Sequence, residues 1–208
     1  MHERKPNRLK GYDYSRDNMF YVTICVHDRI CCFGKITEGS GLDLTLPVTR
    51  KIMQLNEYGK LAWKQWEWLA EQYPYVVLHA FVVMPDHVHG IIEIYRDHID
   101  GSDRDLTQME KCEYDVHGGS GRDLTLQDDR DMTLRNGKII KIKSLSELIG
   151  AYKTTVSKQI HLLGYTKFAW QRSFHDRIIH HEQEYIHDTD YILSNPSNWN
   201  LKKDSRGM

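Results

Sequence analysis

The chain has 208 residues, of which 40% are hydrophobic and 27% are charged, and its formal net charge is −1. The length suits one domain, and the apolar fraction is enough to bury a core. This composition excludes collagen-like and fully disordered proteins. It also excludes membrane-spanning proteins, because no uninterrupted apolar stretch approaches about 18 residues. The N-terminal sequence lacks the apolar region of a signal peptide, so we expect a cytoplasmic protein without membrane contacts.

The charge is unevenly distributed along the chain. Between Asp97 and Leu134 there are eleven acidic and four basic residues, so this segment carries −7 and the rest of the chain carries +6. The segment from 97 to about 137 is polar and shows no apolar periodicity, which predicts an acidic loop or disordered insert within a single domain of residues 1–208.

The first half of the chain begins with β-rich patterns. Residues 19–27 are rich in β-branched and aromatic side chains, and a second short run at 31–36 predicts that the two form a β-hairpin. From 48 to 72, apolar residues recur at helical spacing, which predicts one helix, with a break at Gly59 as an open alternative. Pro74 ends this pattern.

The remaining elements predict a sheet covered by helices. Runs at 75–84 and 87–95 read as two antiparallel strands, central to the sheet because both are apolar. Ser144 and Glu147 have capping-box spacing at the start of a helix that runs to about 163. A strand at 173–179 and a helix from 180 to about 194, ended by Asn195-Pro196, follow. This order predicts an α+β fold with an antiparallel sheet and flanking helices.

Two histidines flank Val88 on one predicted strand. Strand alternation places His87 and His89 on one face, about 6.6 to 7 Å apart along the chain, while Val88 faces the core. Two imidazoles at this spacing can converge on one metal ion. The spacing alone is weak evidence, because 12 histidines in 208 residues give about 0.7 such pairs by chance. A plain pair of histidines on a polar sheet face therefore remains an alternative.

The last predicted helix holds a second group of polar side chains, namely Tyr185, Asp190, Tyr191 and Asn195. Tyr191 and Asn195 are four residues apart, so they project from one side of the helix. A tyrosine with its ordinary pKa near 10 is a poor nucleophile at neutral pH and needs a neighbouring cation or base. The alternative is a core tyrosine followed by a helix-ending asparagine.

Three sequence strings gain meaning when they are taken together. In order and spacing they resemble the single-tyrosine HUH transposases, and most closely the REP-associated tyrosine transposases: Met84-Pro85-Asp86-His87-Val88-His89-Gly90, Trp170-Gln171-Arg172-Ser173-Phe174-His175-Asp176-Arg177-Ile178-Ile179 and Tyr191-Ile192-Leu193-Ser194-Asn195-Pro196-Ser197-Asn198-Trp199. The resemblance covers nearly the whole chain except the acidic insert. It implies a compact, ferredoxin-like HUH fold with an antiparallel sheet and flanking helices.

The resemblance implies roles for four residues. His87 and His89 would bind one divalent metal ion, Mg²⁺ or Mn²⁺, and Tyr191 would be the catalytic tyrosine. The third metal ligand would be Asn195, at a position where the wider insertion-sequence transposases usually have glutamine. The implied reaction is metal-dependent cleavage and strand transfer of single-stranded DNA with hairpin or palindromic ends, through a 5′-phosphotyrosine.

The DNA would need basic contacts, and eight residues are candidates: Arg4, Lys5, Arg8, Lys10, Lys143, Lys153, Lys158 and Arg177. Each lysine could equally be a solvated surface residue, and Arg177 could either contact DNA or brace the tyrosine helix. Some relatives are homodimers that exchange this helix and others act alone, so a homodimer stays open. Two further alternatives are a catalytically silent hairpin-DNA-binding protein and a metal-dependent hydrolase that uses water.

Overall fold

The computed structural model describes residues 12–40, 49–96, 132–135 and 138–199. Three α-helices accompany eight strands in the described chain. The helices are α1 (Glu57–Gln72), α2 (Leu145–Leu162) and α3 (Glu182–Asn198). The strands are β1 (Asn18–Cys25), β2 (Gly34–Ser40), β3 (Thr49–Leu55), β4 (Val76–Val83), β5 (His87–Ile94), β6 (Met132–Arg135), β7 (Lys138–Lys141) and β8 (His175–Ile179).

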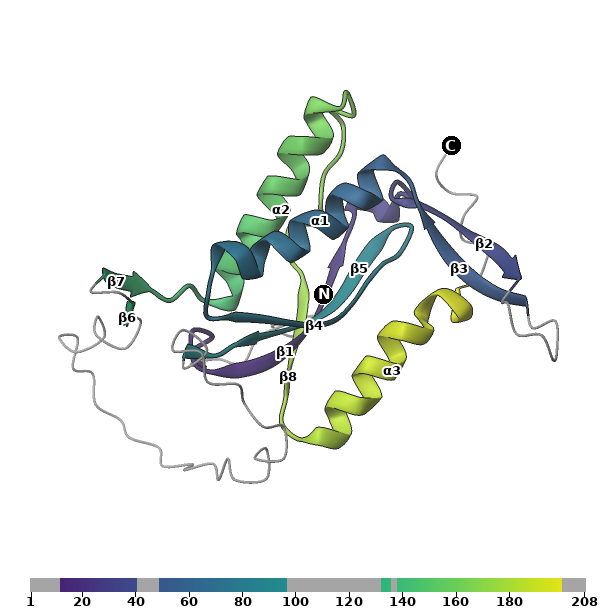
Figure 1. Cartoon of the computed structure of the whole chain (residues 1–208). Coiled ribbons are helices and arrows are strands. Elements are labelled where there is room, and N and C mark those ends of the chain that lie inside the picture. Colours follow the sequence, from purple (N-terminus) through teal and green to yellow (C-terminus); the bar gives the residue numbers. More distant parts are fainter. Residues whose placement is uncertain (1–11, 41–48, 97–131, 136–137, 200–208) are drawn as a thin grey trace, which may run out of the picture.

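The main sheet has four strands in the order β4-β5-β1-β8, and all its neighbours are antiparallel. In chain order, the strands of this sheet and the helices between them are β1, α1, β4, β5, α2 and β8, which is the ferredoxin-like arrangement. Helices α1 and α2 cover one face of the sheet, and α3 lies across the other face (Figure 1). The predicted α+β fold with flanking helices is therefore confirmed.

The larger part of the core lies between the sheet and the pair α1 and α2. Along β1, Phe20, Val22 and Ile24 are fully buried on this side, as strand alternation requires. Val88 of β5 belongs to the same core, as predicted, and Trp66 of α1 packs onto it. A smaller apolar cluster lies on the α3 side and contains Met19, Ile36, Val82, Met84, Ile91, Ile179, Ile192 and Trp199. The sheet is therefore covered on both faces.

Two predictions in the first half of the chain are wrong. The run at 31–36 does not form a hairpin with β1, because β2 pairs with β3 instead. Residues 49–55 form strand β3, and α1 begins only at Glu57, with the Asn56 side chain accepting a hydrogen bond from Gly59 N at 2.9 Å. Gly59 does not break the helix. A Cβ there would lie 2.1 Å from the carbonyl oxygen of Phe33, so glycine permits this close approach.

Three further predictions need correction. Of the two strands predicted to be central, β5 lies between two neighbours, whereas β4 is an edge strand of the main sheet. Helix α3 does not end at Asn195-Pro196 but continues to Asn198, since a proline in the last turn costs a hydrogen bond without preventing that turn. The predicted loop at 97–137 lies mostly outside the described residues, but β6 begins within it and pairs with β7.

The second half of the chain otherwise agrees with the sequence. Helix α2 begins at the predicted capping box, in which Ser144 and Glu147 bond reciprocally. β8 occupies most of the predicted 173–179 segment. Among the described residues, none of the helices is long and apolar enough to cross a membrane.

Candidate active site

The candidate site lies at the start of β5, on the sheet face covered by α3. His87 and His89 project from this face, and each is only 6% exposed. Their Nε2 atoms face each other at 2.9 Å. In the neighbouring strand β1, Cys25 lies opposite His87 and Thr23 lies opposite His89. The strand thus brings the two imidazoles together as alternation predicted.

Each histidine is held through its other ring nitrogen. Nδ1 of His87 contacts the buried carboxylate of Asp86, and Nδ1 of His89 lies 2.8 Å from the hydroxyls of both Tyr21 and Thr23. These contacts leave both Nε2 atoms pointing at the same place. Partners of this kind fix the ring orientation of metal-binding histidines.

The electrostatic surroundings keep His89 neutral. Burial has the largest effect, and the neighbouring His87 and Arg29 add to it, so that the pKa of His89 falls to about 3. A neutral imidazole offers a lone pair at one ring nitrogen, which is the form that binds metals.

Tyr191 comes to this pair from α3. Its ring centroid lies 5.5 Å from that of His89 and 6.4 Å from that of Tyr21, with edge-to-face geometry in both cases. The residue is 46% exposed, so Tyr191 is not a core tyrosine. The structure therefore brings His87, His89 and Tyr191 into one group although more than 100 residues separate His89 from Tyr191.

The buried side of α3 holds it against the sheet. Asp188, Ile192 and Asn195 recur at helical spacing and are all buried. Asn195 is 8% exposed and lies one turn after Tyr191. It is thus a buried amide beside the nucleophile candidate.

Asp188 and Arg177 connect this helix to β8. The Asp188 side chain is only 2% exposed, and the Arg177 guanidinium pairs with its carboxylate. The same guanidinium lies 5.4 Å from the ring centroid of Tyr21. These contacts join β8 to the tyrosine helix, and the contact of Arg177 with DNA stays a prediction. Burial raises the pKa of Tyr21 from 10.0 to about 12.

The residues fit a divalent metal ion. Two ligands at about 2.0 to 2.1 Å from one octahedral ion and at right angles are about 2.8 to 3.0 Å apart, which agrees with the 2.9 Å between the two Nε2 atoms. Among the described residues no group of three or more His, Cys, Asp or Glu side chains could hold a metal. A third protein ligand would therefore come from another side chain, and the buried amide of Asn195 is the candidate that the sequence suggests.

The remaining polar residues predicted on α3 do not join this group. Tyr185 points to the other end of the sheet, where its hydroxyl lies 3.4 Å from Nδ1 of His79. Asp190 lines a groove between α3 and β3, together with Lys51 and Leu193.

The predicted DNA-contacting residues are dispersed. Arg4, Lys5, Arg8 and Lys10 lie outside the described residues. Lys143 Nζ is 5.9 Å from the ring centroid of Tyr73.

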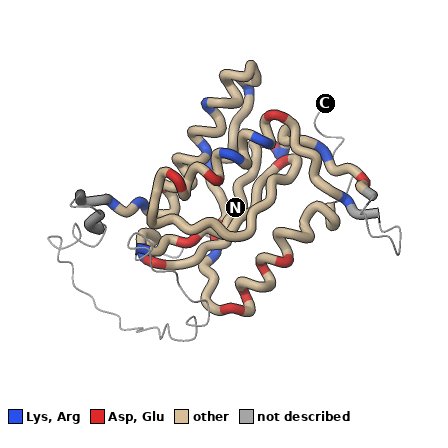
Figure 2. The backbone as a smooth tube through the Cα atoms, viewed as in Figure 1, with Lys and Arg blue, Asp and Glu red and all other residues tan. Residues whose placement is uncertain are grey.

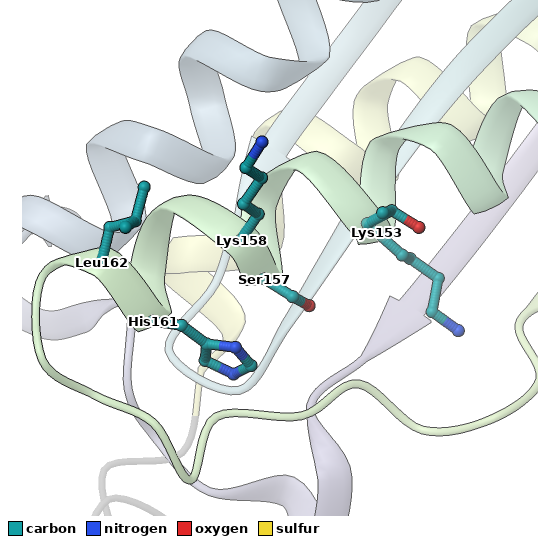
Figure 3. A pocket seen from close by; sticks show the side chains of 6 residues that line it. Lys153, Ser157, Lys158, His161 and Leu162 are labelled. Carbon is teal, nitrogen blue, oxygen red and sulfur yellow. The ribbon is translucent and has the colours of Figure 1, made fainter.

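Lys153 and Lys158 lie on α2, in a groove with Ser157 and His161 (Figure 3). Lys153 Nζ donates to the carbonyl oxygens of Gln171 at 2.6 Å and Arg172 at 3.1 Å. Basic residues mark α2, whereas α3 carries four acidic residues and no Lys or Arg (Figure 2).

Sequence reasoning assigned no role to several residues at the site. Asp86 stands within the quoted string and holds His87, while Arg29 lies 3.5 Å from the Asp86 carboxylate. Trp199 covers His87, with ring centroids 5.8 Å apart. Alternation along β1 could have placed Tyr21 and Thr23 on the face opposite Phe20 and Val22, but only strand register reveals that they meet His89.

No family model matches the chain. A protein of Haemophilus influenzae, itself uncharacterised, is 26% identical over 199 residues, which cover 96% of this chain and 91% of that protein. Among solved structures, a REP-associated tyrosine transposase bound to a REP hairpin matches with a TM-score of 0.47 and 15% identity, over 98% of this chain and 77% of that one.

Proposed function

We propose that this protein is a DNA strand transferase that cleaves and rejoins single-stranded DNA beside a hairpin, with Tyr191 as its nucleophile. One observation carries the proposal: the Nε2 atoms of His87 and His89 converge to 2.9 Å, and the half-exposed Tyr191 packs against His89. A buried imidazole pair with an accessible tyrosine beside it suits attack on a phosphodiester. The three strings in the sequence supply the same residues in the same order.

The reaction follows from the chemistry of these side chains. The Tyr191 oxygen attacks phosphorus in line with the leaving oxygen, so that a bond from the tyrosine oxygen to phosphorus forms and the bond from phosphorus to O3′ breaks. The tyrosine proton is lost and the leaving O3′ gains a proton, which gives a 3′-hydroxyl and a 5′-phosphotyrosine. A 3′-hydroxyl of a second strand can then reverse the step. The number of phosphoester bonds is conserved, so no nucleotide hydrolysis is needed.

The surroundings of Tyr191 serve this reaction in two ways. Trp199 packs against His87 and Tyr191 packs against His89, so the nucleophile is held beside the imidazole pair. His87, His89 and Asn195 would hold one Mg²⁺ or Mn²⁺ ion, which would withdraw negative charge from the scissile phosphate. Imidazole ligands are softer than the oxygen ligands that Mg²⁺ prefers, so Mn²⁺ is the better ion for a first assay.

The substrate is proposed from charge and from the sequence motifs. Outside the segment Asp97 to Leu134 the chain carries +6, which favours association with a polyanion. Helix α3 carries four acidic residues and no Lys or Arg, which disfavours contacts between this helix and the DNA backbone. Helix α2 lies on the opposite face of the sheet from Tyr191 (Figure 1), so we propose Lys153 and Lys158 as contacts for DNA away from the cleavage site. The basic residues of the N-terminal segment are proposed as further contacts.

The test is an adduct assay with a matched control. A labelled single-stranded hairpin oligonucleotide from the flanks of the gene is incubated with the protein and Mn²⁺, and the products are separated on a denaturing gel. We expect a covalent adduct that mass spectrometry locates on Tyr191, and its loss with EDTA and in Tyr191→Phe. Tyr185→Phe removes a hydroxyl from the same helix but faces His79, so it should retain the adduct.

Other outcomes would favour the alternatives. If the protein binds the hairpin tightly but forms no adduct with Mg²⁺ or Mn²⁺, it is a hairpin-binding protein without turnover. If Tyr191→Phe still cuts the DNA, water is the nucleophile and the protein is a metal-dependent hydrolase. Either result would refute the proposed strand transfer.

A further inference from the structure

Tyr21 contacts both the imidazole pair, through His89, and the candidate nucleophile Tyr191. Its hydroxyl lies 2.8 Å from Nδ1 of His89, and its ring stacks on the His89 ring with centroids 5.6 Å apart. The opposite edge of the site is formed by Tyr191, whose ring centroid is 6.4 Å from that of Tyr21. The rings of Tyr21, His89 and Tyr191 therefore form one closed cluster, since the ring centroids of Tyr191 and His89 are also only 5.5 Å apart.

From this geometry we propose that Tyr21 is a positioning residue, which aims Nε2 of His89 at the metal ion and supports the ring of Tyr191. The inference rests on the proposed function, because it assigns Tyr21 a task in that reaction. Two groups of Tyr21 have separate roles: its hydroxyl orients the imidazole of His89, and its ring supports the ring of Tyr191.

The hydroxyl has a defined task because the two histidines are held differently. His87 donates from Nδ1 to the carboxylate of Asp86, whereas the described partners of His89 at Nδ1 are the hydroxyls of Tyr21 and Thr23, both at 2.8 Å. Neutral acceptors hold an imidazole less firmly than a carboxylate does. Removing one of two hydroxyls should therefore weaken the orientation of His89, and removing both should release the ring.

The ring of Tyr21 is itself held from its other side. Arg177 is its cross-strand neighbour on β8, and the guanidinium lies 5.4 Å from the ring centroid. That guanidinium also pairs with the buried carboxylate of Asp188 on α3. Tyr21 is thus fixed between β8 and β5, and it can serve as a rigid support for Tyr191.

The first experiment measures Mn²⁺ binding to the DNA-free protein, from the electron paramagnetic resonance signal of the free ion. We expect Tyr21→Phe and Thr23→Val each to weaken Mn²⁺ binding about 3- to 10-fold, and the double variant to weaken it about 10- to 100-fold. Losses of this size are typical when the hydrogen-bond partners of metal ligands are removed. Tyr185→Phe is the matched control and should bind Mn²⁺ like the unaltered protein. Equal affinity of Tyr21→Phe and the unaltered protein would overturn the role of the hydroxyl.

The second experiment separates the ring from the hydroxyl. Tyr21→Phe keeps the ring and Tyr21→Leu does not, although both lack the hydroxyl. At saturating Mn²⁺ we expect the single-turnover rate of adduct formation to be about tenfold or more lower in Tyr21→Leu than in Tyr21→Phe. Equal rates would overturn the role of the ring, and urea unfolding of both variants shows whether they are folded.

The failure of this inference and the failure of the proposed function give different results. If the unaltered protein binds Mn²⁺ but forms no adduct, the proposed function fails and the ring role fails with it, while the hydroxyl role is still decided by Tyr21→Phe. If the unaltered protein forms the adduct and both Tyr21 variants behave like it, only the present inference is overturned. If the unaltered protein does not bind Mn²⁺, both proposals are overturned.

Discussion

Gly90 follows His89 on β5 and faces the opposite side of the sheet, where α1 packs. The indole of Trp66 stacks there on Phe81, with ring centroids 4.5 Å apart and planes inclined by 6°. A Cβ at residue 90 would lie 2.6 Å from Trp66 Cζ2 and 2.9 Å from Phe81 Cδ2. Glycine is therefore required here by the close approach of the two rings, and Gly90→Ala should strain this part of the core.

The size of the effect follows from these distances. Ordinary carbon contacts lie at about 3.5 to 4.0 Å, so the new methyl group would have to displace the indole by roughly 1 Å. Overpacking of this kind costs about 1–3 kcal/mol. Replacing glycine by alanine also restricts the unfolded chain, which returns about 0.4–1 kcal/mol. We expect a net loss in the free energy of unfolding of about 1–2 kcal/mol, or roughly 2–8 °C in Tm.

The assay is urea unfolding, followed by tryptophan fluorescence, because Trp66 is buried and lies at the strained contact. Gly150→Ala is the matched control. A Cβ at residue 150 has nothing within 4 Å, and the residue lies inside α2, so alanine should stabilise the protein by about 0.5–1 kcal/mol. A Gly90→Ala protein as stable as the unaltered one would refute the argument from close packing.

Three further outcomes are expected from other parts of the molecule. Arg177→Gln leaves the buried Asp188 carboxylate without the guanidinium, and we expect the free energy of unfolding to fall by about 2 kcal/mol, between the values for exposed and buried pairs. Adding Asp188→Asn should recover part of this loss. If the effects of the two substitutions on denaturant unfolding simply add, the pairing is contradicted. The backbone hydrogen bond from Ser144 lowers the pKa of Glu147 below 4.5, so its carboxylate stabilises the fold above pH 4.5 and this stabilisation is lost as the pH falls through the lowered pKa. The stability difference between the unaltered protein and Glu147→Gln should accordingly be about a few tenths of a kcal/mol at pH 7 and shrink as the pH falls below 4.5, and a constant difference would disprove the role of the charge. If Lys158 contacts a DNA phosphate, Lys158→Gln should reduce the slope of log K against log salt concentration by about 1 in a hairpin-binding titration, and an unchanged slope would exclude that contact.

Local patterns in the sequence were enough to predict several elements. The capping box at Ser144 and Glu147 marks the start of α2, because its hydrogen bonds form between residues three apart. Strand alternation placed His87 and His89 on one face and Val88 in the core, since side chains of a strand point alternately to its two faces. These features depend only on near neighbours in the chain.

Other predictions failed where local patterns are ambiguous. Residues 49–55 contain apolar positions compatible with a helix, but pairing with β2 makes them a strand. Both β4 and β5 are apolar, yet only β5 lies between two strands, and β4 is at the edge. Short apolar runs do not reveal their partners, because hydrogen bonding across the sheet decides between these outcomes.

The sequence by itself thus determined the α+β class, the helices and strands with strong local signals, and, through its three strings, a candidate group of His87, His89, Tyr191 and Asn195. Only the tertiary structure decided that Tyr191 lies against His89, that Arg177 pairs with Asp188 of α3, and that the ring of Tyr21 packs against both His89 and Tyr191. The physical reason is that these contacts join β1, β5, β8 and α3, which are far apart in the chain. Their distances are set by strand register and by the packing of α3 on the sheet, and neither can be read from the spacing of residues along one segment.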